Sequence, residues 1–176
     1  MDEIEIVAYD PDWPARFEAE AAELHRVLDP ALVVGLEHFG STAIAGLAAK
    51  PVIDILIAVR SLAAARSAFV GPLRGLGYVF WAENPKTDRL FFVKGMPPYG
   101  ARRTHHVHVT EPTGEPWQRL AFRDYLRAHP DEAKRYERLK LDLAARHRND
   151  REAYTDAKTA YVDEIVALAR REKRTG

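Results

Sequence analysis

The chain has 176 residues, with 26 basic and 26 acidic side chains, so its formal net charge at neutral pH is zero. Hydrophobic residues make up 47% and charged residues 30%, a composition that excludes a disordered chain and indicates a globular protein. Without an excess of positive charge, the sequence gives no strong indication of nucleic-acid binding. The absence of cysteine excludes disulfides and thiolate metal ligands, so any metal must be bound by histidines and carboxylates.

The same properties lead us to expect a cytoplasmic protein. No apolar run approaches the about 20 residues that cross a membrane, so we expect no membrane-spanning segment. The acidic start of the chain, residues 1–5, is unlike a signal peptide. The length favours a single domain over residues 1–176, and the sequence does not indicate an oligomeric state.

Hydrophobic periodicity predicts a half that mixes strands and helices, followed by a helical half. Strands are expected over residues 4–9, 33–39, 51–59, 78–81, 90–94 and 104–110. Helices are expected over about residues 14–28, 61–75, 116–128, 131–148 and 155–172. The run 51–59 is apolar apart from Asp54, which is typical of an internal strand covered on both faces. This order indicates an α+β fold, or a mixed-sheet α/β fold.

A Gly-Ser pair, Gly40 and Ser41, follows the predicted strand 33–39. Glycine allows the backbone to approach a ligand closely, and a serine hydroxyl with neighbouring N–H groups can hold a phosphate. Lys50, farther along the same loop, could contact a phosphate as a point charge. The alternative is structural: the pair forms an ordinary turn in which Ser41 or Thr42 caps the next helix, and Lys50 is exposed.

Asp54 is the sharper functional signal. It lies between two isoleucines, where burying a carboxylate without a partner is costly. A Mg²⁺ ion would satisfy it, because hard divalent cations favour carboxylate oxygens together with substrate phosphates. The alternative is an aspartate that caps a helix or pairs with Lys50 or an arginine. Leu56 stands two residues on, so the pattern lacks a paired Asp-x-Asp.

The predicted strand 104–110 contains three histidines. Alternation places His106 and His108 on one face of the strand and His105 on the other. Two imidazoles on one face can share a metal, act as acid and base, or donate to a phosphate. The alternative is that one of them hydrogen-bonds within the core while the other is exposed.

Further candidates lie beside these motifs. Glu37 and His38 end the strand before the Gly-Ser pair, and one of them is expected to point into the same cleft, although alternation does not tell which. Arg102 and Arg103 could add positive charge to an anion-binding cleft, or could lie in a solvated loop.

Taken together, segments 9–14, 37–42, 46–55, 105–109, 122–127, 136–140 and 154–161 resemble the GrpB family of bacterial and archaeal proteins over nearly the whole chain. That family is placed in the nucleotidyltransferase-fold superfamily, and similar domains occur fused to dephospho-CoA kinase. The resemblance implies a small mixed sheet flanked by helices, in which Gly40 and Ser41 hold nucleotide phosphates and Asp54 binds Mg²⁺. The family's usual second carboxylate falls on Leu56, so Glu37 or a histidine would have to complete the metal shell.

These residues lead to three hypotheses. The first is an enzyme that uses Mg²⁺ to transfer a nucleotidyl group from an NTP to an acceptor. The second is a non-catalytic module that binds a nucleotide or another phosphorylated small molecule and regulates a partner enzyme. The third is a metallo-hydrolase of phosphate esters with a transition metal on the histidines. The predicted site residues are Asp54, His106 and His108 for catalysis, Asp54, Glu37 and His108 for metal, and Gly40, Ser41, Thr42, Lys50 and Arg103 for the nucleotide.

Overall fold

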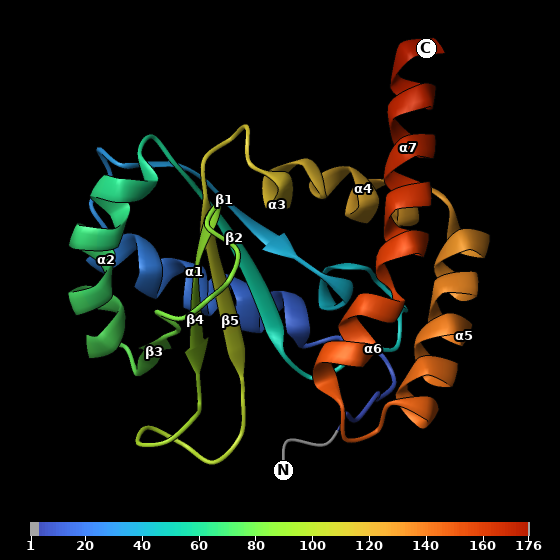
Figure 1. Cartoon of the computed structure of the whole chain (residues 1–176), viewed down its shortest axis with the longest axis horizontal. Helices are drawn as coiled ribbons and strands as arrows, with labels where there is room; N and C mark the ends of the chain where they lie inside the picture. Colours follow the sequence, from blue (N-terminus) through green and yellow to red (C-terminus); the bar gives the residue numbers. More distant parts are fainter. Residues whose placement is uncertain (1–3, 176) are drawn as a thin grey trace.

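The computed structural model describes residues 4–175 and contains a five-stranded mixed sheet flanked by helices (Figure 1). The strands are β1 (Val33–Phe39), β2 (Ile53–Val59), β3 (Tyr78–Phe80), β4 (Arg89–Lys94) and β5 (His105–Thr110). The helices are α1 (Trp13–Val27), α2 (Leu62–Gly75), α3 (Glu115–Gln118), α4 (Leu120–Ala128), α5 (Pro130–Arg146), α6 (Arg151–Ala157) and α7 (Thr159–Thr175), with a 3-10 turn η1 (Ser41–Ala43). The expected α+β fold with a helical C-terminal half is confirmed.

The sheet has the strand order β1-β2-β5-β4-β3. β2 and β5 run parallel, whereas the other neighbouring pairs are antiparallel. Parallel strands need a long crossover, and here that connection contains α2, β3 and β4. The two strands that carry the predicted aspartate and histidines are therefore direct neighbours.

Helices α1 and α2 cover one face of this sheet. Ile55 and Ile57 of β2 and Val107 and Val109 of β5 are fully buried in the core on that side. They pack in one cluster with helix residues that include Trp13, Leu24, Phe69 and Leu73. Because side chains alternate along a strand, the even-numbered residues of β2 and β5 point to the opposite face.

The helical half packs beside the β1 edge of the sheet, as Figure 1 shows. Ile44 and Leu47, in the loop after η1, form a second core cluster with Leu126 of α4, Tyr136 of α5 and Ile165 of α7. The loop that carries the Gly-Ser pair is thus held between the sheet and the helices.

Residues 4–9 do not form the predicted strand. Val7 makes only an isolated bridge with Ala49, in which each N–H donates to the other's carbonyl at 2.9 and 3.0 Å. The segment alternates only weakly, and Ala49 is the single residue that its backbone pairs with in this bridge, so no strand ladder is formed.

Two predicted helices are each divided. The segment 116–128 is interrupted at Arg119, which separates α3 from α4, and the segment 155–172 is interrupted at Lys158, which separates α6 from α7. Helix α6 also begins earlier than predicted, at Arg151, because the Asp150 carboxylate accepts a hydrogen bond from the Ala153 N–H at 2.9 Å.

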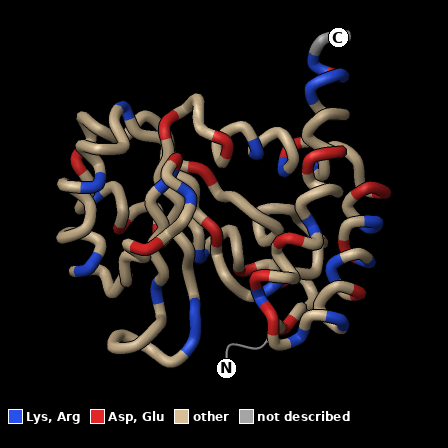
Figure 2. Tube along the Cα trace, in the orientation of Figure 1, with Lys and Arg blue, Asp and Glu red and all other residues tan. Residues whose placement is uncertain are grey.

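Acidic and basic residues are interspersed along the chain, including along the helical half (Figure 2). Positive charge at any site must therefore come from a few individual side chains rather than from one broad basic face. Within the part of the chain that the structure describes, no helix is both long and apolar enough to cross a membrane.

Candidate functional site

Asp54 lies near the start of β2, on the sheet face that α1 and α2 do not cover. Its side chain retains 27% exposure, although the isoleucines on either side of it are buried in the core. Leu56 shares this face but is fully buried. β2 therefore presents one carboxylate to the site and an apolar side chain at the position of a second acid.

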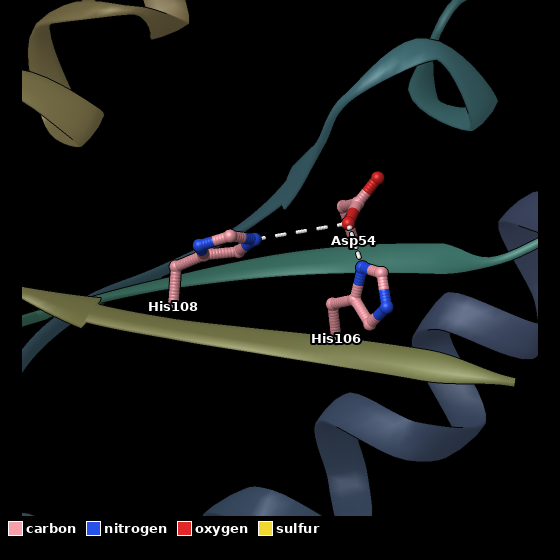
Figure 3. Close-up of side chains that lie close together, drawn as sticks. All are labelled: Asp54, His106 and His108. Atoms are coloured by element: carbon pink, nitrogen blue, oxygen red, sulfur yellow. Dashed lines mark hydrogen bonds and ion pairs between the residues drawn. The ribbon is translucent and has the colours of Figure 1, made fainter. Parts of the chain in front are cut away.

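Two histidines of β5 converge on Asp54 (Figure 3). In the parallel register His106 pairs with Asp54, and His108 pairs with Leu56. The Nδ1 atom of His106 lies 2.9 Å from Asp54 Oδ1, and the Nε2 atom of His108 lies 3.7 Å from the same oxygen. The predicted placement of His106 and His108 on one strand face is confirmed, and both histidines lie against the Asp54 carboxylate.

Phenylalanines of the neighbouring strands hold the two imidazole rings. The Phe91 ring centroid lies 5.1 Å from that of His106 and 4.8 Å from that of His108. On the other side, Phe39 meets His108 edge-on at 5.9 Å. The ring orientations are therefore set by packing as well as by Asp54.

The electrostatics of this cluster favour a charged carboxylate beside a neutral imidazole. Burial opposes ionisation of Asp54, but the hydrogen bond from His106 and the proximity of His108 outweigh it and hold the aspartate pKa well below its usual range. Burial lowers the pKa of His106, despite the opposing effect of Asp54. At neutral pH the cluster thus offers one anionic oxygen and the neutral imidazole that metal binding requires.

The Gly-Ser turn packs directly on the Asp54 carboxylate. Gly40 has φ +71° and ψ −171°, a backbone conformation essentially restricted to glycine. A Cβ atom at this position would lie 2.6 Å from Asp54 Oδ2, so no larger residue fits without displacing the carboxylate. The turn brings the start of η1, at Ser41, next to Asp54.

A recess of about 130 Å³ opens beside this turn. Its polar lining combines Gly40 and Ser41 with residues of the helical half, namely Arg119, Arg123, Tyr136, Thr155, Lys158 and Thr159. The recess is thus built from two parts of the chain that are more than 70 positions apart.

Lys158 is the distinctive cation of this recess. Arg119 and Arg123 each form ion pairs with carboxylates, to Asp163 at 3.7 Å and to Glu37 at 2.7 Å respectively. Within residues 4–175, Lys158 forms no ion pair, and its Nζ lies 4.1 Å from the centre of the Tyr154 ring.

Burial, together with the positive charges of Lys50 and Lys140, lowers the pKa of Lys158 to about 7. Burial likewise lowers the pKa of Lys140 to about 7, and its ammonium donates to the Ala48 carbonyl. An anion bound beside these lysines would offset both the repulsion between their charges and the loss of hydration, so the arrangement favours anion binding.

The remaining predicted residues lie around this centre. Glu37 points to the site face, where its carboxylate binds Arg123, and it does not lie in the cluster of Asp54, His106 and His108. Lys50 lies near the recess, with its ammonium 5.4 Å from the Tyr154 ring. Arg103 is half-buried in the loop that precedes β5.

His38 and Thr42 support the turn instead of lining the recess. The His38 ring stacks on Phe17 of α1 at 4.6 Å, so of the pair Glu37 and His38 the glutamate faces the site. The Nε2 atom of His38 lies 3.0 Å from the buried Thr42 hydroxyl. His105 faces away as predicted, with its Nε2 atom 3.9 Å from Glu20.

Sequence reasoning missed Phe91, Arg119, Arg123 and Lys158. They lie on β4 and in the helical half, far from the motifs in sequence. A sequence signal existed only for Arg123 and Lys158, which lie in segments that resemble the GrpB family. Neither segment contains a motif that by itself indicates a binding or catalytic role.

With this geometry in place, the chain can be compared with known proteins. A family model described as GrpB protein matches residues 3–168. The chain belongs to the GrpB family. The crystal structure of the conserved protein GrpB from Enterococcus faecalis shares the fold, with a TM-score of 0.83 and 32% sequence identity over 96% of this chain and 99% of that one.

Two sequence relatives are longer than the part of each that this GrpB-family chain matches. A UPF0157 protein of Pseudomonas aeruginosa is 52% identical over 167 residues, which cover 94% of this chain and 66% of that protein. A protein of Mycolicibacterium paratuberculosis named dephospho-CoA kinase is 34% identical, over 88% of this chain and 43% of that protein. The chain therefore spans less than the full length of both relatives.

Replacing Gly40 by alanine tests the contact between the turn and Asp54. We expect Gly40→Ala to lose about 1–3 kcal/mol of unfolding free energy from backbone strain alone, and more from the clash with Asp54 Oδ2. The matched control is Gly71→Ala in α2, where a Cβ meets nothing within 4 Å and should add about 0.5–1 kcal/mol. Urea unfolding measures both variants, and wild-type stability in Gly40→Ala would contradict this account of the turn.

Acid should destabilise the protein partly through His38. Burial lowers the pKa of His38 to about 4, so between pH 4 and about 6.5 the unfolded chain binds the extra proton and stability rises with pH. The slope from one such group is at most about 1.4 kcal/mol per pH unit. Urea unfolding at pH 4.5, 5.5 and 7 should show a weaker pH dependence in His38→Gln than in wild type. The exposed His25→Gln serves as control, and equal slopes for His38→Gln and wild type would disprove the assignment.

Proposed function

We propose that the chain binds a nucleoside triphosphate and transfers its nucleotidyl group to an acceptor. The observation that carries this proposal is the Gly40–Ser41 turn packed on the Asp54 carboxylate, beside a recess lined by the half-buried Lys158. If the turn held a phosphate and Asp54 a metal ion, this arrangement would put the two within contact distance, as nucleotidyl transfer requires. Membership in the GrpB family supports the proposal through the superfamily in which that family is placed.

The size of the recess indicates which end of the ligand would enter it. About 130 Å³ is well below the roughly 300–1,000 Å³ of a typical small-molecule pocket. A phosphate group on Ser41 and Lys158 would fill it, and the sugar and base would remain outside. In this placement, the phosphate next to Gly40 also lies next to Asp54.

The residues of the chain would then bind and orient the reacting groups. The acceptor oxygen bonds to the α-phosphorus, the bond to the β-phosphate oxygen breaks, pyrophosphate leaves, and the proton of the acceptor passes to solvent. Lys158 would stabilise the negative charge of the leaving phosphates. A divalent ion, which Asp54, His106 and His108 could hold, would supply further neutralisation of the phosphate oxygens.

One observation favours a second candidate, a non-catalytic module that binds a phosphorylated ligand. Leu56 is fully buried at the position where a second carboxylate would bind metal. The relative named dephospho-CoA kinase is compatible with a module attached to an enzyme that handles phosphates. Both candidates require ligand binding at Ser41 and Lys158, and only the first requires turnover.

Nucleotide binding and turnover can be measured on one set of proteins. We expect at least one of the four NTPs to bind in the presence of Mg²⁺ or Mn²⁺, and Lys158→Met to weaken that binding at least tenfold. The exposed Lys134→Met is the matched control and should bind as wild type does. Phosphorus NMR detects pyrophosphate release with candidate acceptors. Failure of all four NTPs to bind would rule out the first candidate and the nucleotide-binding form of the second.

Anion binding should also be linked to proton uptake. An anion beside Lys158 favours its charged form and raises its pKa from about 7, so binding at pH 8 should take up a proton. Sulfate is a suitable probe because it does not titrate in this range. Calorimetry in buffers of different ionisation enthalpy should detect uptake at pH 8, little at pH 5.5, and less at pH 8 in Lys158→Met. Equal uptake in the variant and wild type would exclude Lys158 as the anion partner.

A further inference from the structure

The missing second carboxylate has a counterpart on the neighbouring strand. Leu56 stands where β2 would present a second acid, and in the parallel register it pairs with His108 of β5. Asp54 pairs in the same way with His106. β5 therefore presents two imidazoles to the space in front of the single carboxylate.

The separations between Asp54 and the two histidines are close to those of ligands around one ion. Two ligands about 2.1 Å from the same metal lie about 3.0 Å apart at a right angle and about 3.4 Å apart at a tetrahedral angle. Asp54 Oδ1 is 2.9 Å from His106 Nδ1 and 3.7 Å from His108 Nε2. One donor atom from each of the three residues can be chosen so that all lie within 4.8 Å of one another. Any pair that is farther apart than about 4.2 Å, twice the ligand distance, would be drawn together by side-chain rotation when the ion binds.

A purely structural hydrogen-bond cluster explains this geometry less well. At 3.7 Å, His108 Nε2 is too far from Asp54 Oδ1 for a hydrogen bond, yet its ring points at that oxygen (Figure 3). Packing on Phe91 thus holds both rings with one nitrogen, Nδ1 of His106 and Nε2 of His108, toward the Asp54 carboxylate.

We propose that Asp54, His106 and His108 bind one divalent transition-metal ion, of the Mn²⁺ to Zn²⁺ series, in preference to Mg²⁺. Imidazole nitrogens suit these ions, whereas Mg²⁺ takes oxygen ligands in a near-octahedral shell. Three protein ligands leave coordination positions open for water or phosphate oxygens. The inference rests on the proposed function only in placing the ion at Asp54.

Metal titration of the untagged, chelator-treated protein without nucleotide tests this inference. Co²⁺ should bind one per chain and give the visible absorption of a site with nitrogen ligands. Calorimetry should show Zn²⁺ or Co²⁺ binding at least 100-fold more tightly than Mg²⁺. His108→Ala and Asp54→Asn should weaken Co²⁺ binding at least tenfold, with circular dichroism to verify folding. The exposed His25→Ala should leave it unchanged.

Two results would overturn the inference, and neither depends on catalysis. The first is Mg²⁺ binding as tightly as Co²⁺, or no stoichiometric Co²⁺ binding to the wild-type protein. The second is loss of affinity in His25→Ala equal to that in His108→Ala. Tight Co²⁺ binding in a protein that binds no NTP would support the metal site and contradict the proposed function alone, so the two failures are distinguishable.

Discussion

A carboxylate in an internal strand must be satisfied by its neighbours, and the structure around Asp54 follows from that requirement. The Oδ1 atom of Asp54 lies next to the two histidines of β5. The Oδ2 atom lies against the turn at Gly40, whose backbone conformation only glycine adopts readily. The parallel pairing of β2 with β5 is what brings the histidines to the aspartate. Without this pairing, the lower pKa of Asp54 and the convergence of the two rings would both be lost.

The helical half completes the site from the other side of the turn. Arg123 of α4 binds the Glu37 carboxylate at 2.7 Å and the His38 carbonyl at 2.8 Å, which attaches the helices to the end of β1. With the helices attached in this way, Lys158, at the interruption between α6 and α7, lines the same recess as Ser41. The recess therefore depends on tertiary docking, and a bound anion would offset the cost of holding the charged, half-buried Lys158 there.

The sequence predicted the parts of this site that follow from local patterns. The apolar run around Asp54 and the alternation that puts His106 and His108 on one face need only the two-residue period of a strand. Strand β1 was predicted with its observed bounds, because the apolar run that begins at Val33 leads directly into the Gly40–Ser41 pair. The weak alternation over residues 4–9 was misleading because no strand was available to pair with it.

The rest of the site depends on contacts that no local pattern encodes. Register decides that His106, and not another residue of β5, lies beside Asp54. Phe91 enters the site because β4 is the other neighbour of β5, and Lys158 enters because a helix is interrupted there. The choice between Glu37 and His38 was also settled by the packing of His38 on Phe17.

The central claim is that the Gly40–Ser41 turn and the Asp54 cluster form one ligand site. A crystal structure with Mn²⁺ and a non-hydrolysable NTP analogue, recorded with anomalous data, tests it most directly. The account predicts an anomalous peak between Asp54, His106 and His108, with phosphate density against Gly40 and Ser41. The absence of that peak, with the hydrogen bond between His106 and Asp54 intact and no phosphate at the turn, would contradict it.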